Sequence, residues 1–242
     1  MWSLGNEAGI GPNFTAMHQL AHKLDPTRPT HYHFDTPDRS CDILGGFYRN
    51  VATEGYKEGA NRYLSIPNLE FAATSDHFDR PILMNEFCHA MGNAVGNLTE
   101  YVQLFDKYPK LVGVCIWDWV DQGVLTKTED GESYYGFDGD FGGVHSGFTN
   151  FCLNGLIFPD RTYGGKLTEV KAAYSNIWAD LKQNNKKEAT ITIHNKNVFD
   201  ELKDKCMDWT LYKDGQAIEN KTVSDITTPS QWKRVLTCNM EI

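Results

Sequence analysis

The segment 111–117, with the sequence LVGVCIW, constrains the fold more than any other part of the chain. It is apolar throughout and shows no alternation of polar and apolar residues. A strand with one face in water would alternate, so this segment is predicted to be a β-strand that is covered on both faces. Strands of this kind occur mainly in parallel sheets, because crossover helices cover both faces of such a sheet. The chain is therefore predicted to contain a parallel sheet with helices packed against it.

Helical patterns and short apolar runs alternate over the first 171 residues. Apolar residues at helical spacing predict two helices: Met17, Leu20, Ala21 and Leu24 after a start signal at 11–13, and Val95, Leu98, Val102 and Phe105 after a cap at 92–93. Strands are expected at 2–4, 29–34, 43–48, 81–85 and 111–117. A TIM barrel needs eight such strands, and about five are visible. The fold class is therefore α/β, and residues 1–171 are expected to form the second half of a (β/α)8 TIM-barrel catalytic domain.

The pattern changes over residues 172–242. The segment 189–194 alternates with period two, and the segment 209–212 runs into Lys213-Asp214-Gly215, which is a hairpin turn signal. Further strands are expected at Val223 and at 232–236, and residues 184–187 are expected to be a polar loop. This part is predicted to be a partial antiparallel β-sandwich of the immunoglobulin-like kind.

Two glutamates, Glu7 and Glu86, stand where catalytic side chains of such a barrel are found. Each follows a short apolar run and precedes a polar or glycine-containing turn, which is typical of the carboxyl end of a buried strand. Tyr48 and Trp117 occupy the same place in their own units. Active sites of TIM barrels lie at this end of the strands, and glycoside hydrolysis uses a pair of carboxylates that face each other. The two glutamates are therefore the candidate catalytic pair.

Composition excludes several classes of function. The net charge of −9 disfavours a nucleic-acid partner, which requires clustered lysine and arginine. No run of 18 apolar residues is present, so no membrane span and no membrane partner are expected. Six cysteines without any C-x-x-C spacing are expected to be ordinary thiols rather than a disulfide framework or a zinc site. Aromatic residues make up 12% of the chain, which suits both a packed core and stacking on sugar rings.

Two further pairs of residues invite a functional interpretation that the sequence does not support. His31 and His33 point to one face of a strand, but no carboxylate or cysteine partner lies at metal-ligand spacing, so both are interpreted as packing or barrel-lining residues. Asp118 and Asp121 are expected to accept hydrogen bonds from the backbone and from neighbouring loops.

Several motifs in order resemble the large bacterial β-galactosidases of glycoside hydrolase family 2. These are WSLGNE at 2–7, NEFCHAMGN at 85–93, WDWVDQ at 117–122, GDFG at 139–142, FCLNGLI at 151–157 and LTEVK at 167–171. The resemblance runs from residue 1 to about 175 and continues more weakly through the remaining residues. It implies hydrolysis of terminal non-reducing β-D-galactose residues through a covalent galactosyl-enzyme intermediate, with retention of configuration.

The resemblance also implies roles for individual residues. Glu7 would be the proton donor and later the general base, and Glu86 would be the nucleophile, with their carboxyl groups ~5–5.5 Å apart. Substrate contacts carry over to five positions: Asn6 at the 2-hydroxyl, Tyr48 beside the nucleophile, His89 at a galactose hydroxyl, Trp117 as a stacking platform and Asn154 near the 6-hydroxyl.

Two metals, Mg²⁺ and Na⁺, are implied by the same resemblance. Glu7 would be one magnesium ligand, while Phe151 and Asn154 would give the backbone and side-chain oxygens of a sodium site. Both sites are incomplete in this chain, because the family takes further ligands from an earlier strand and from an upstream aspartate. The chain also departs from the family pattern at Phe87, where tyrosine is common, at Asn85, which is often cysteine, and over 143–150.

Alternatives remain open on the sequence alone. A related family-2 β-glucuronidase or β-mannosidase would share the two acids. The chain is also expected to be a fragment of the whole enzyme, catalytically incomplete and with little activity of its own, because half a barrel exposes unpaired strand edges. We expect a β-galactoside substrate, a homo-oligomer in the full-length enzyme, and a cytoplasmic location, with a periplasmic one as the alternative.

Overall fold

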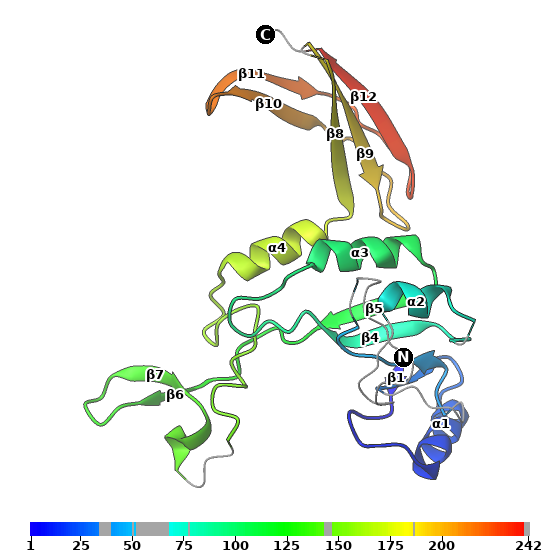
Figure 1. The fold of residues 1–242 in the computed structure, drawn as a ribbon, viewed down its shortest axis with the longest axis vertical. Coiled ribbons are helices and arrows are strands. Elements are labelled where there is room, and N and C mark those ends of the chain that lie inside the picture. Colours follow the sequence, from blue (N-terminus) through cyan, green and yellow to red (C-terminus); the bar gives the residue numbers. More distant parts are fainter. Residues whose placement is uncertain are drawn as a thin grey trace. The chain divides into compact units, whose positions relative to one another are not determined.

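The computed structural model describes residues 1–33, 40–49, 51, 68–76, 78–142, 147–185 and 187–239. The chain consists of two compact units, Met1–Ala173 and Tyr174–Ile242 (Figure 1).

A parallel sheet runs through the first unit, with its strands side by side in the order of the sequence. The strands are β1 (Trp2–Ser3), β2 (Thr30–Tyr32), β3 (Ile43–Leu44), β4 (Ile82–Phe87) and β5 (Leu111–Ile116). All four neighbouring pairs are parallel. This confirms the parallel sheet predicted from the segment 111–117, and the sequential order fits part of a TIM barrel. Phe34, expected at the end of the second strand, lies outside the described residues.

Four α-helices belong to this unit in the described part of the chain: α1 (Pro12–Leu24), α2 (Leu69–Thr74), α3 (Leu98–Lys107) and α4 (Gly165–Ala173). Helix α1 begins as predicted, with Pro12 in the first turn after Gly11. Helix α3 begins later than predicted, after Asn97, so the expected cap at 92–93 is wrong. The reason is that Val95 and Asn97 have φ angles of 76° and 60°, which no α-helix accommodates. Val95 still packs in the core, which explains its place in the apolar pattern.

The core of the first unit lies between the helices and the last two strands of the sheet. Helices α2, α3 and α4 lie on the same side of β4 and β5 (Figure 1). Buried residues come from each of these elements, among them Leu69, Met84, Phe87, Leu98 and Val170. Each fully buried side chain of this size contributes roughly 1.5–3 kcal/mol relative to an exposed one. The packing of these helices against the sheet therefore fixes the carboxyl ends of β4 and β5, which carry Glu86 and lead into Trp117.

An excursion that the sequence analysis did not predict follows β5. It contains an antiparallel hairpin of β6 (Val124–Lys127) and β7 (Ser133–Gly136) and a short 3₁₀ helix, η1 (Asp138–Phe141). The peptide bond between Trp117 and Asp118 at the end of β5 is cis. The Asp130-Gly131 pair lies at the turn between β6 and β7, with Gly131 at φ 87°. This turn signal in the sequence could have predicted the hairpin.

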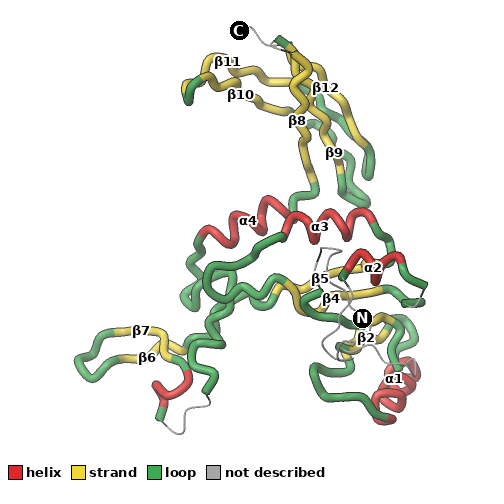
Figure 2. The backbone as a smooth tube through the Cα atoms, viewed as in Figure 1, coloured by secondary structure: helices red, strands yellow, loops and turns green. Residues whose placement is uncertain are grey.

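The second unit consists of antiparallel strands and loops in its described part (Figure 2). Its strands are β8 (Ile177–Asn185), β9 (Glu188–Asn195), β10 (Met207–Lys213), β11 (Gln216–Val223) and β12 (Lys233–Asn239). They form a three-stranded sheet in the order β12-β9-β8 and a separate β10-β11 hairpin.

The structure confirms the hairpin predicted at Asp214-Gly215 and the strands predicted at 189–194 and 232–236. The polar loop predicted at 184–187 is wrong in part, because Asn184 and Asn185 belong to β8. Exposed polar side chains in an edge strand resemble a loop in composition, and only the pairing with β9 separates the two. A small apolar core joins Ile193 of β9 with Leu202 and Ile226.

Candidate active site

Glu7 and Glu86 lie at the carboxyl ends of their strands. Glu86 belongs to β4 and is partly buried, while Glu7 follows β1 by four residues and is exposed, with φ 48°. Burial raises the pKa of Glu86, and the negative charge of Glu7 raises it further. The two carboxylates are therefore close enough to influence each other, although 79 positions (86 − 7) separate them in the sequence.

Tyr48 stands beside Glu86. Its backbone N–H donates to the Glu86 carbonyl oxygen over 3.0 Å, and the preceding Phe47 pairs with Glu86 as an isolated parallel bridge. The Tyr48 hydroxyl is buried and completes no hydrogen bond of good geometry with the described residues, but it lies near enough to lower the pKa of Glu86. Burial and the charge of Glu86 in turn raise the pKa of Tyr48, so the phenol remains protonated. Tyr48 can thus donate to an ionised Glu86.

The side chains of Asn85 and His33 form a partly buried pair next to the two acids, and sequence reasoning missed the role of this pair. Asn85 and His33 are joined by their side chains, with 2.6 Å between Asn85 Nδ2 and His33 Nδ1. The Asn85 Oδ1 accepts from Gly46 N over 3.1 Å, and His33 Nε2 lies 3.9 Å from Glu7 Oε1. His33 was interpreted as a packing residue, and it does stack on Phe47, but it also connects β4 to the Glu7 carboxylate.

His89 continues the site on the other side of Tyr48. Its ring centroid lies 6.0 Å from that of Tyr48 and 5.4 Å from that of Phe151. Burial lowers the pKa of His89, so the imidazole is neutral at pH 7. Its Nε2 is buried and has no hydrogen-bond partner among the described residues, although its Nδ1 accepts from Met91 N over 3.3 Å. A neutral imidazole with one ring nitrogen available suits a ligand hydroxyl.

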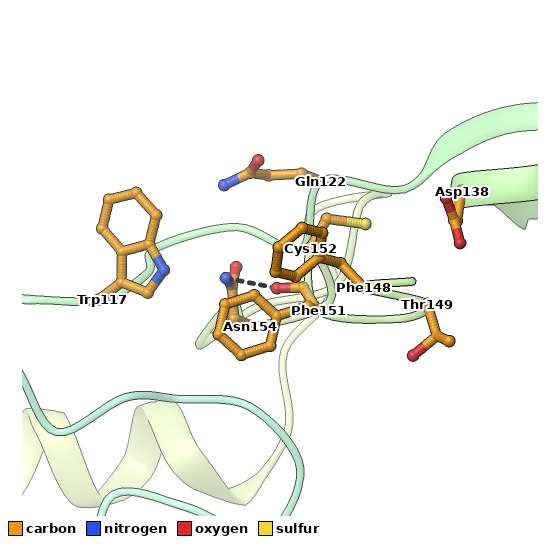
Figure 3. Close-up of a pocket in the computed structure, with 8 residues that line it drawn as sticks. All are labelled: Trp117, Gln122, Asp138, Phe148, Thr149, Phe151, Cys152 and Asn154. Carbon is orange, nitrogen blue, oxygen red and sulfur yellow. Dashed lines mark hydrogen bonds between the residues drawn. The ribbon is translucent and has the colours of Figure 1, made fainter. Parts of the chain in front are cut away.

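A pocket of about 320 Å³ adjoins Phe151. Figure 3 shows Trp117 facing the turn that carries Phe148 and Phe151, with Asn154 between them. The lining residues are Trp117, Gln122, Asp138, Phe148, Thr149, Phe151, Cys152 and Asn154. Of these, the sequence analysis singled out Trp117, Phe151 and Asn154. Gln122 and Cys152 belong to two of the quoted motifs but were given no role, whereas Asp138, Phe148 and Thr149 lie outside them, and only the fold brings all of these residues to one place.

Asn154 forms the buried polar group of this pocket. Its side chain is 2% exposed, and its Nδ2 donates to the Phe151 carbonyl oxygen over 3.0 Å (Figure 3). Its Oδ1 is buried and has no partner among the described residues. Such an amide oxygen beside a carbonyl oxygen is suited to a small cation or to a ligand hydroxyl.

Three candidates remain: Asn6, which lies next to Glu7, and the two aspartates Asp118 and Asp121, which hold the backbone after β5. Asn6 is exposed directly before Glu7, and no contact joins it to the other candidate residues in the described part of the chain. Asp118 accepts from Trp119 N over 2.5 Å and from Gln122 Nε2 over 2.6 Å, and Asp121 accepts from Gly155 N over 2.6 Å. The prediction that these two aspartates hold backbone and loops is confirmed.

Comparisons with known proteins identify the family. The family model described as "Glycosyl hydrolases family 2, TIM barrel domain" matches residues 1–179. The chain is 34% identical over 246 residues to a β-galactosidase of Vibrio vulnificus (strain CMCP6), covering 99% of this chain and 23% of the relative. It is 36% identical over 239 residues to a β-galactosidase of Leuconostoc mesenteroides subsp. mesenteroides, covering 97% and 22%. The chain thus spans less than a quarter of the length of these relatives.

One solved structure also aligns with most of the chain. It is the crystal structure of an FMN-binding β-glucuronidase from Facaelibacterium prausnitzii L2-6, with a TM-score of 0.44, 14% identity, and coverage of 99% of this chain and 37% of that one. The family model matches well over half of the chain, in the part that holds the parallel sheet and both glutamates. On this evidence the chain belongs to glycosyl hydrolase family 2 and carries part of its TIM-barrel domain.

Proposed function

We propose that the protein carrying this chain is a retaining β-galactosidase, which removes terminal non-reducing β-D-galactose residues through a covalent galactosyl-enzyme intermediate. The observation that carries the proposal is the position of Glu7 and Glu86 at the carboxyl ends of β1 and β4, where the charge of Glu7 raises the pKa of Glu86 and Tyr48 lies beside Glu86. Two relatives named β-galactosidase, at 34% and 36% identity, favour galactose over glucuronic acid or mannose. Since the chain spans only part of those relatives, the activity belongs to the whole protein.

In the first step, Glu86 attacks the anomeric carbon while Glu7 gives its proton to the departing glycosidic oxygen. A partly buried carboxylate is a suitable nucleophile because it is poorly hydrated, and the Tyr48 hydroxyl stabilises its charge before attack. Glu7 is exposed and has room for the aglycone. In the second step, Glu7 removes a proton from water, the water oxygen bonds to the anomeric carbon, and Glu86 leaves as a carboxylate.

The sugar would be held by the residues around the two acids. His89 offers a neutral imidazole with a buried Nε2, and Trp117 offers an indole face at the edge of the pocket. Asn6 is assigned to the 2-hydroxyl and Asn154 to the region of the 6-hydroxyl, both by family resemblance. The partial solvent exposure of Trp117, at 36%, fits a platform that a sugar covers on binding.

Both metals stay proposals, and the residues present fit them to different degrees. The buried Asn154 Oδ1 and the Phe151 carbonyl oxygen are neutral oxygens of the kind that Na⁺ accepts, so this half of a sodium site fits. Glu7 offers one exposed carboxylate to Mg²⁺, which requires further oxygen ligands. A bound cation would neutralise charge and orient hydroxyls near the reacting carbon.

The wider organisation follows the same proposal. Residues 1–171 would be the second half of the TIM-barrel catalytic domain, and residues 172–242 would be part of an immunoglobulin-like β-sandwich. The small apolar core between the β12-β9-β8 sheet and residues of the β10-β11 hairpin supports a two-layer arrangement. The whole enzyme is proposed to be a homo-oligomer.

The test uses the whole protein with nitrophenyl galactoside, glucuronide and mannoside. We expect galactoside to be hydrolysed fastest, with β-galactose as the first product by NMR. Glu86→Gln should abolish turnover, and Glu7→Ala should lose ~10²–10⁴-fold in rate and regain part of it with azide. Glu100→Gln, an exposed change on α3, is the matched control. Preference for another glycoside, inversion of configuration, or equal azide rescue of both variants would contradict the proposal.

A further inference from the structure

A cluster of metal-ligating side chains lies away from the two glutamates. His18 and His22 of α1 and Asp42, which directly precedes β3, each offer a ligand atom, and these atoms all lie within 4.8 Å of one another. His22 Nε2 is 2.8 Å from Asp42 Oδ2, and the two histidine rings stand edge to face with centroids 4.7 Å apart. All three residues are partly buried. No metal-binding role is given to them by the family resemblance or by the proposed function.

The local structure brings the three ligands together for identifiable reasons. His18 and His22 are four residues apart on a helix, so their side chains lie on one face. That helix is held against the sheet by Phe14, whose ring centroid lies 3.9 Å from that of Tyr32 in β2. Asp42 is held on the same side by β2, because Thr30 donates to its Oδ2 through N at 2.7 Å and through Oγ1 at 2.9 Å. The cluster is therefore largely formed before any ion enters.

The donor set determines which ion would fit. Two imidazoles and one carboxylate form the three-ligand set of many zinc sites, in which water takes the fourth position. Imidazole suits Zn²⁺, Cu²⁺ and Ni²⁺, whereas Mg²⁺ and Ca²⁺ prefer oxygen ligands only. The contacts of Thr30 with Asp42, and the 2.7 Å contact between Thr30 Oγ1 and His18 Nδ1, would orient these ligands as outer partners of an ion.

We propose that His18, His22 and Asp42 bind one divalent transition-metal ion of the zinc class, which fastens α1 to the amino ends of β2 and β3. Thr30 and Asp42 lie at the start of their strands, whereas Glu7 and Glu86 lie at the carboxyl ends. The opposite end of a TIM barrel from the active site is associated with stability. The ion is therefore structural and does not take part in sugar hydrolysis.

Metal titration of the 242-residue chain tests this inference. After dialysis against chelator, Zn²⁺ is added at pH 7.5 and followed by calorimetry, and Co²⁺ is added as a spectroscopic probe. We expect one site with a four-coordinate Co²⁺ absorption spectrum, and a rise in melting temperature with Zn²⁺. His18→Gln and His22→Gln should each weaken this binding at least tenfold.

The matched control is His194→Gln in the second unit. His194 Nε2 lies 2.6 Å from Asp180 Oδ2, and no second histidine joins this pair among the described residues, so its loss should leave the affinity unchanged. Circular dichroism checks that each variant is folded. If a histidine variant fails to fold, broadening of the His18 and His22 ring signals by Co²⁺ in the unchanged chain decides the question. Absence of binding, binding unaffected by either substitution, or broadening elsewhere would overturn the inference.

Discussion

The backbone N–H of Tyr48 donates a hydrogen bond to the carbonyl oxygen of Glu86 over 3.0 Å. The bond continues the parallel pairing of β3 with β4 beyond the last residue of β3, since Phe47 bridges to Glu86 at the same level. The main chain, rather than a side-chain contact, thus fixes Tyr48 next to Glu86. The phenol and the carboxylate perturb each other's pKa as a result.

Tyr48→Phe should shift the acidic limb of the pH–rate profile of the whole enzyme to higher pH. The tyrosine lowers the pKa of Glu86, so its removal raises that pKa and keeps the nucleophile protonated over a wider range. The tyrosine favours the charged form of Glu86, so the acidic limb should move to higher pH when the hydroxyl is removed. The measurement is kcat/KM against pH. Tyr163→Phe, at a side chain that is 72% exposed, is the control, and an unmoved acidic limb would contradict the interpretation.

Asn85→Ala should destabilise the first unit by about 2 kcal/mol. The substitution removes partners from Gly46 N and from His33 Nδ1, and a buried polar group without a partner costs about 1–3 kcal/mol. Urea unfolding measures the loss. Asn13→Ala, at an exposed position of α1, should change the stability by less than about 0.5 kcal/mol. Equal effects of the two substitutions would show that the Asn85 amide is not a support of the site.

Gly45→Ala should be poorly tolerated. A Cβ atom at this position would lie 2.0 Å from the Tyr32 carbonyl oxygen and 2.3 Å from that of His33. Both obstacles are backbone atoms, so β2 and the segment after β3 would have to separate, at a cost of about 3 kcal/mol. Gly96→Ala is the comparison, because nothing lies within 4 Å of the Cβ that it adds. The free energies of unfolding of the two variants test the claim, and similar values would contradict it.

Acid should destabilise the chain through His31. Burial, and to a smaller extent the charge of His33, lower the pKa of His31 to about 4. The unfolded chain therefore binds more protons than the folded chain between about pH 6.5 and pH 4. Stability that is present above pH 6.5 is lost as the pH falls through this window, by at most about 1.4 kcal/mol per pH unit for one group.

Urea unfolding at a series of pH values measures this dependence. His31→Leu should reduce the slope between pH 6.5 and pH 4, whereas Asn13→Ala, an exposed change without a titratable group, should leave it as it is. An unchanged slope in His31→Leu would assign the acid sensitivity to other groups.

No described helix of the chain is long and apolar enough to cross a membrane.

Much of the fold followed from local patterns. The unalternating segment 111–117 predicted β5 and with it the parallel sheet, and Asp214-Gly215 predicted the β10-β11 hairpin. The predicted start of α3 was too early. The apolar residues keep helical spacing from Val95 onward, but the left-handed backbone at Val95 and Asn97 prevents a helix there, and the spacing does not reveal this. The β6-β7 hairpin was not predicted because both strands are only four residues long and β6 is largely exposed, so the side chains carry little of the pattern that burial imposes.

The sequence by itself determined the residue types and their positions at strand ends: two glutamates, a tyrosine and a tryptophan after short apolar runs. Only the tertiary structure decided which of them interact. Glu7, His33 and Asn85 belong to three different strand units. Parallel pairing brings them together through a partly buried hydrogen bond between Asn85 and His33 and a 3.9 Å approach of His33 to Glu7. The same holds for His18, His22 and Asp42. Local spacing records the face on which a side chain lies, whereas a contact between segments depends on how the sheet and helices pack.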